Sequence, residues 1–194
     1  MQNTDSIIKK LYIKSYESDQ AGYVDLSLPK NRLISIGLKI LDNSFKGSLS
    51  YDLDRLYDEL VYFNHYSQKG QACPLNFYLP MILANRSYDT YEASLVDLAG
   101  KIQTYYGSLD RIDDYIIQVQ AYDRLIRAYI RSGGQSMEGD KLISILTDIK
   151  ADLVAYNLPK KTKKETINFQ LKKLKYIGKI HKIIDAMEGI STYN

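Results

Sequence analysis

The chain has 194 residues, an apolar share of 45% and a formal net charge of +3. This length is enough for one full hydrophobic core and short for two, and no apolar run approaches the roughly 20 residues that a membrane helix needs. The segment from Met1 to Ser6 lacks the features of a secretory signal, and the single cysteine, Cys73, can form no internal disulfide, so we expect a cytoplasmic protein without a membrane segment.

The first half of the chain is patterned for helices, because apolar residues recur at helical spacing and no strand-length window alternates between apolar and polar residues. We expect one helix near the start of the chain, one that begins at Pro29, and one that ends before Gly70. Pro74 and Pro80 bracket the apolar run 75–83. That run has room only for a short or kinked helix, which we expect to be buried whole.

The second half is predicted to hold a helix over 90–107 and a longer one that starts after Ser108 and ends at Gly133. The longer helix is the best amphipathic segment of the chain and is expected to be central. Its apolar stripe consists of Leu109, Ile112, Ile116, Val119, Ile126 and Ile130. Ser136 can cap the next helix, which continues to Pro159.

A capping box marks the last helix, which we expect over about 162–189, because the side chains of Thr162 and Glu165 can satisfy each other's backbone amides. One apolar face is predicted from Ile167, Leu171, Leu174, Ile177, Ile180, Ile184 and Met187. A second seam at heptad spacing consists of Phe169, Tyr176, Ile183 and Ile190. So wide an apolar surface predicts contact with two neighbouring elements or with a partner chain, including a second copy joined through this helix.

The last fifth of the chain is strongly basic, with nine lysines and three acids between Pro159 and Asn194. Four lysines crowd the helix start, where positive charge opposes the helix dipole: Lys160, Lys161, Lys163 and Lys164. Four more form a stripe along the helix: Lys172, Lys175, Lys179 and Lys182. These are the candidate binding residues, for an acidic protein surface or for nucleic-acid phosphate, and a solvated helix face is the alternative. Because this region has no arginine, nucleic-acid binding would be non-specific.

Three polar residues fall on otherwise apolar faces and are candidates for a polar pocket: Asp123, Asn64 and His181. A buried aspartate needs a charged or multiply hydrogen-bonded partner. Arg124 and Arg127 lie close to Asp123 in the sequence, but we expect helix geometry to exclude both as in-line partners of its carboxylate.

Carboxylates also occur in pairs one helical turn apart, and two such pairs on facing helices could hold Mg²⁺. The weak candidates for a metal site are Asp54, Asp58, Asp110 and Asp114. The helix dipole equally favours acids near helix N-termini, so we expect no metal. The segment 134–141 superficially resembles a phosphate loop but has Asp140 where that loop needs lysine, so we expect no cofactor.

The sequence therefore predicts a single all-α domain over residues 1–194, a bundle of about seven helices. The leading interpretation is a small interaction or regulatory module that acts through protein-protein contacts and is not an enzyme. One alternative is a helical protein that associates non-specifically with nucleic acid through its C-terminal lysines. A third is an enzyme with a carboxylate-lined site between helices.

Overall fold

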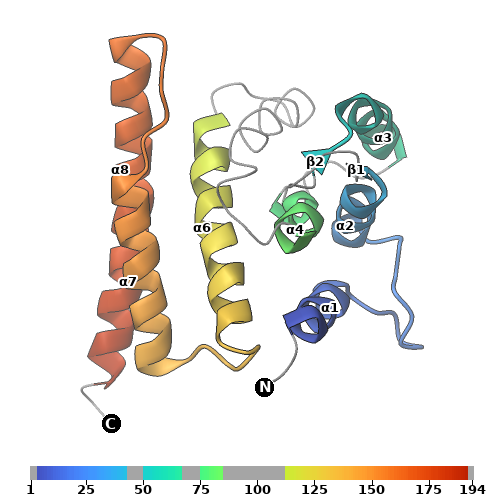
Figure 1. The fold of residues 1–194 in the computed structure, drawn as a ribbon, viewed down its shortest axis with the longest axis horizontal. Coiled ribbons are helices and arrows are strands. Elements are labelled where there is room, and N and C mark those ends of the chain that lie inside the picture. Colours follow the sequence, from blue (N-terminus) through green and yellow to red (C-terminus); the bar gives the residue numbers. More distant parts are fainter. Residues whose placement is uncertain (1–3, 43–49, 67–74, 85–111, 192–194) are drawn as a thin grey trace. The chain divides into compact units, whose positions relative to one another are not determined.

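The computed structural model describes residues 4–42, 50–66, 75–84 and 112–191, and 77% of them are helical. This described part contains seven helices, which confirms the all-α class (Figure 1). The chain divides into two compact units, Met1–Ile112 and Asp113–Asn194. The single domain over residues 1–194 stays a prediction, and the helix expected over 90–107 lies outside the described residues.

The described helices of the first unit are α1 (Thr4–Ser15), α2 (Pro29–Lys39), α3 (Leu53–Tyr66) and α4 (Leu75–Ala84). Pro29 stands in the first turn of α2 as expected, because a first-turn residue has no intrahelical partner for its amide. Two strands of two residues, β1 (Leu41–Asp42) and β2 (Ser50–Tyr51), pair antiparallel between α2 and α3. Such a short ribbon leaves the fold class unchanged.

Helix α4 packs along α2 and also contacts α1. Every residue from Phe77 to Leu83 is buried, including Pro80, whereas Leu75 and Asn76 are half-buried. The prediction of a short helix is therefore confirmed, and its burial is complete from Phe77 on. Leu33 and Ile34 of α2 are fully buried as well. The apolar run and the amphipathic helix together therefore account for most of the buried apolar residues that the structure describes in this unit.

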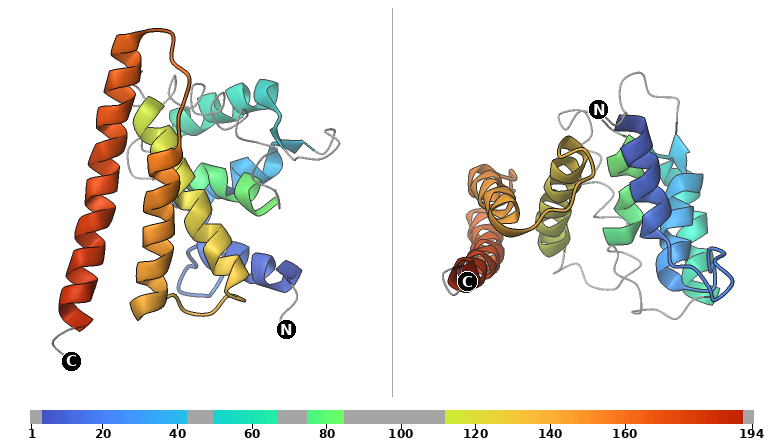
Figure 2. Two further views of the ribbon diagram at one scale, coloured as in Figure 1. Left: turned by 60° about the vertical axis from the view of Figure 1, so that its left-hand side comes forward. Right: turned by 90° about the horizontal axis from the view of Figure 1, so that it is seen from below.

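The second unit is built from α6 (Ile112–Arg131), all but its first residue, together with α7 (Gly139–Ala155) and α8 (Lys163–Ser191). Helices α7 and α8 pack together as an antiparallel hairpin, which Figure 2 shows from two directions. The three helices meet in a cluster of four buried side chains: Ile117 of α6, Ile149 and Leu153 of α7, and Phe169 of α8.

Helix α6 is buried along two faces. Ile116, Val119 and Ile126 of the predicted stripe are 3%, 2% and 6% exposed, as a stripe that faces a core should be. Ile117 lies on a different face, which packs against α7 and α8. The helix ends before Gly133, whose φ of 73° is the left-handed conformation that glycine adopts readily.

The two helix starts that the sequence predicts in the second unit differ in outcome. The capping box of α8 is confirmed: the Glu165 amide donates to Thr162 Oγ1 at 3.2 Å, and the Thr162 amide donates to Glu165 Oε2 at 3.1 Å. The cap expected at Ser136 is wrong, because α7 begins at Gly139 with Glu138 as its N-cap. The Ser136 hydroxyl donates to the Glu138 carboxylate instead.

Candidate protein-interaction face on helix α8

Helix α8 buries parts of both predicted apolar faces and neither one along its whole length. The inward side chains with buried or half-buried surface are Phe169, Tyr176, Ile177, Ile180 and Ile184. In contrast, Ile167, Leu171 and Leu174 are 49%, 60% and 58% exposed. The predicted face from Ile167 to Met187 therefore does not pack inward along its whole length, and contact of its first three members with a partner chain stays a prediction.

The aromatic rings explain which side of the first half of α8 is buried. Phe169 and Tyr176 lie one heptad apart, and large rings remove more apolar surface from water than aliphatic side chains do. Tyr176 also receives a 2.6 Å hydrogen bond from Gln118 Nε2 of α6, so its hydroxyl keeps a partner inside. Over the first half of α8, the side that carries the rings is therefore buried, and Ile167, Leu171 and Leu174 are left at the surface. Farther along the helix, Ile180 and Ile184 face inward and Ile183 is 50% exposed.

The exposed apolar side chains and the lysines beside them form one surface, here called the α8 face: Ile167, Leu171, Leu174, Lys163, Lys164, Lys175 and Lys182. The three apolar residues stand at i, i+4 and i+7 and form a row. Lys164 lies three residues before Ile167 and Lys175 four residues after Leu171, so each is a same-side neighbour of the row. The α8 face is therefore an apolar row bordered by positive charge.

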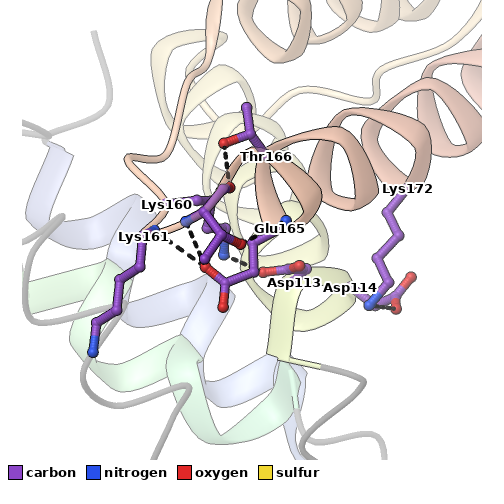
Figure 3. Close-up of polar contacts among 8 residues, drawn as sticks. Asp113, Asp114, Lys160, Lys161, Glu165, Thr166 and Lys172 are labelled. Carbon is purple, nitrogen blue, oxygen red and sulfur yellow. Dashed lines mark hydrogen bonds and ion pairs between the residues drawn. The ribbon is translucent and has the colours of Figure 1, made fainter.

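Two of the eight candidate lysines are instead held within the second unit by carboxylates of α6, as Figure 3 shows. Lys160 Nζ lies 2.5 Å from Asp113 Oδ1 and 5.0 Å from the centroid of the Phe169 ring. Lys172 Nζ lies 3.5 Å from Asp114 Oδ2. These pairs join α8 and the segment before it to the first turn of α6. The other six candidates are exposed: Lys161, Lys163, Lys164, Lys175, Lys179 and Lys182.

Lys173 is a structural residue that the sequence reasoning missed. It is 4% exposed, and its ammonium donates to the backbone carbonyls of Val154 at 3.0 Å and Tyr156 at 2.8 Å. These carbonyls lie at the C-terminal end of α7, where backbone acceptors have no intrahelical partner and positive charge is favourable. Its position between Phe169 and Tyr176, at i+4 and i−3, is the signal that could have placed it on the inward face.

The ammonium of Lys173 gives a pH prediction, because burial lowers its pKa by removing hydration from the charged form. The unfolded chain then binds more protons than the folded protein as the pH approaches the ordinary lysine pKa of about 10.4, so stability from this group rises with pH there. We expect the free energy of unfolding of the wild type, relative to Lys173→Met, to increase between about pH 8 and about pH 10 in urea denaturation. The exposed Lys175→Met is the control for the loss of one lysine, and a flat or falling difference at Lys173 would contradict the assignment.

Asp123 is fully buried within an ion network. Arg127 Nε donates to its two carboxylate oxygens at 2.9 and 3.0 Å, and Arg124 Nη1 lies 3.8 Å away. The expectation that neither arginine would be an in-line partner is wrong for Arg127, because the i,i+4 spacing brings its guanidinium beside the carboxylate. Arg124 Nε also lies 2.8 Å from Asp152 Oδ2 of α7. The network therefore joins α6 to α7.

The three residues considered for a polar pocket are not shown to share one. Asp123 is paired within α6, whereas His181 is an exposed residue of α8 with its Nδ1 3.3 Å from Asp185 Oδ1. His181 follows Leu174 by seven residues, so it shares the outward side of the helix. Asn64 belongs to α3, and its side chain lies outside the described residues.

The four acids considered for a metal site also have separate surroundings. Asp58 is exposed on α3, Asp114 pairs with Lys172, and Asp110 and the side chain of Asp54 lie outside the described residues. Among the side chains that the structure describes, no group of three or more His, Cys, Asp or Glu residues could hold a metal ion.

No helix within the described ranges has the length and apolar character needed to cross a membrane. Comparison with protein-family models, curated proteins and solved structures finds no match to this chain.

Proposed function

We propose that this protein is a protein-interaction module that binds an acidic partner through the α8 face. The observation that carries the proposal is the row of Ile167, Leu171 and Leu174, each about half exposed on a helix whose opposite side is already packed. Isolated exposed apolar residues are ordinary, but three in one row on one helix face are typical of a helix that docks into a groove or against a helix of a partner.

The row offers a modest apolar contribution to binding. Full burial of a leucine or isoleucine is worth roughly 1.5–3 kcal/mol, so completing the burial of a half-exposed one contributes about 1 kcal/mol. Three such side chains give a weak contact alone, because association also costs translational and rotational freedom. Charge attraction to the bordering lysines is the additional contribution that the α8 face supplies.

The positive charge of these lysines discriminates between the possible classes of partner. A second α8 face placed against the first would bring Lys164 and Lys175 of both copies together, and like charges at an interface are repulsive. A duplex or single strand of nucleic acid would match the charge, yet phosphates make no use of an apolar row. Lys160 and Lys172 are also already engaged by carboxylates of α6. An acidic protein surface that also presents apolar side chains complements both the apolar row and the lysines of the α8 face.

The test uses a synthetic helical peptide with leucines at i, i+4 and i+7 and glutamates beside them, and a control peptide with every glutamate replaced by lysine. We expect the wild type to bind the acidic peptide, more weakly at high salt, and not to bind the basic one. Leu171→Ser combined with Leu174→Ser should weaken binding by about tenfold or more, since each removes roughly 1 kcal/mol of apolar burial.

Val61→Ser is the matched control, because Val61 is 44% exposed on α3 and outside the α8 face. This variant should bind the acidic peptide as tightly as the wild type. Equal binding of both peptides, or unchanged affinity in the Leu171/Leu174 variant, would overturn the proposal. Tight, salt-sensitive binding of a short DNA duplex in place of the acidic peptide would favour the nucleic-acid alternative.

A further inference from the structure

The connection between α1 and α2 exposes a second apolar surface, here called the Tyr23 loop (residues 17–28). Tyr23, Val24 and Leu26 are 74%, 48% and 54% exposed. Three large apolar side chains so close in sequence contribute little to folding where they stand. Tyrosine in particular is enriched among the residues that dominate binding energy at protein interfaces.

One buried side chain of α2 holds the backbone of the Tyr23 loop through hydrogen bonds. Asn31 of α2 is fully buried, and its Nδ2 donates to the carbonyls of Glu17 and Asp25, both at 2.7 Å. Its Oδ1 accepts a 3.0 Å hydrogen bond from the Glu17 amide. One amide side chain thus joins the two ends of the loop, and Lys30 adds an ion pair to Glu17 at 2.9 Å.

The tip of the Tyr23 loop is ordered by its own turn. Asp19 Oδ1 accepts from the amides of Ala21 and Tyr23, both at 2.9 Å, and the Asp19 amide donates to the Tyr23 carbonyl at 2.8 Å. Gly22 makes this turn with a φ of 83°, a conformation that residues with a side chain rarely adopt. Because the loop is already fixed before any contact, a partner would not have to order it on binding.

The charge of the Tyr23 loop is opposite to that of the α8 face. Residues 17–28 contain three acids, Glu17, Asp19 and Asp25, and no basic residue. Hydrogen bonds from the side chain and backbone of Ser27 lower the pKa of the Asp25 carboxyl, so it stays ionised at neutral pH. The chain therefore carries an apolar surface with acids on one unit and an apolar row bordered by lysines on the other.

We infer that the Tyr23 loop of one copy of this protein docks on the α8 face of a second copy, with Tyr23 and Val24 against the row of Leu171 and Leu174. The inference rests on the proposed function, because it names a second copy as the acidic partner. The contact is heterologous, since two different surfaces meet. The pair keeps one unused loop on one copy and one unused α8 face on the other, so assembly continues until a ring closes or a chain of copies forms.

The test measures mass by sedimentation velocity for the wild type and two variants. The loop variant carries Tyr23→Ser and Val24→Ser, and the face variant carries Leu171→Ser and Leu174→Ser. We expect the wild type to grow beyond the 22.3 kDa monomer as concentration rises, and to do so less at high salt. Each variant alone should stay monomeric. Mixed together they should form a dimer of one copy of each, because one intact loop then meets one intact α8 face.

The control is Leu38→Ser, a change at an exposed apolar position of α2 outside both surfaces, which should assemble as the wild type does. A wild type that stays monomeric at all concentrations would overturn the head-to-tail contact. Association of the wild type without a dimer in the mixture would also overturn it and indicate a symmetric contact. Binding of the acidic helical peptide by a monomeric wild type would leave the proposed function standing while this inference fails.

Discussion

Replacing Asp123 by alanine is expected to lower the free energy of unfolding by about 3–5 kcal/mol, the cost of breaking a buried ion pair by removing one partner. Asp123 has no exposed surface, and the side chain of Arg127 is only 15% exposed. The substitution leaves the Arg127 guanidinium inside the protein without the carboxylate that receives its Nε hydrogen. Urea denaturation followed by circular dichroism measures the loss.

Two further variants test whether the loss of stability comes from the ion pair between Asp123 and Arg127. Asp152→Ala removes a half-exposed carboxylate from Arg124 and should cost less than about 1 kcal/mol. Asp123→Leu combined with Arg127→Met replaces both partners by apolar groups and should recover part of the loss. A cost for Asp123→Ala as small as that of Asp152→Ala would show that the ion pair makes no such contribution.

Features decided by a few neighbouring residues could be predicted from the sequence. The capping box of Thr162 and Glu165, the start of α2 at Pro29 and the short buried helix around Pro80 all depend on local chemistry, and all three are confirmed. The Ser136 cap is an instructive exception. Serine is a good N-cap residue, but α7 begins at Gly139, too far along the chain for Ser136 to serve as its cap.

Features decided by packing between helices could not be predicted in the same way. Helix α8 has more apolar positions than one face can bury, and the choice depends on what α6 and α7 present to it. The Gln118 amide of α6 donates to the Tyr176 hydroxyl, and carbonyls at the end of α7 accept from Lys173, so the first half of α8 packs with its Phe169 side inward. The aromatic positions of α8 indicate this side, but the groups that hold it there belong to α6 and α7.

The same packing determines which side chains of α8 are exposed at the candidate site. The eight lysines were predicted as one group, and only the structure shows that Lys160 and Lys172 lie against acids of α6 while the remaining six are exposed. The apolar surface of this helix was predicted to contact two neighbouring elements or a partner chain, and the exposure of Ile167, Leu171 and Leu174 is the finding on which the proposed function depends. The Tyr23 loop was not among the sequence predictions, because Asn31, which fixes its backbone, lies fourteen residues after Glu17 in the sequence.

Phe169→Ala is expected to lower the free energy of unfolding by about 3–5 kcal/mol, the range for removing a buried aromatic ring. The ring is 1% exposed and lies in the cluster that joins the three helices of the second unit. Its centroid is 6.1 Å from that of Tyr156 in an edge-on arrangement, and the Lys160 ammonium lies over it. The alanine variant therefore removes apolar burial, a ring pair and a cation contact together.

The matched change on the same helix is Leu171→Ala, which should alter the free energy of unfolding by less than about 0.5 kcal/mol because Leu171 is 60% exposed. The two variants in parallel urea denaturation report which side of α8 faces the core. If Leu171→Ala costs as much as Phe169→Ala, the row of Ile167, Leu171 and Leu174 is buried in solution. The α8 face would then be part of the core, and the acidic partner would have no apolar row to contact.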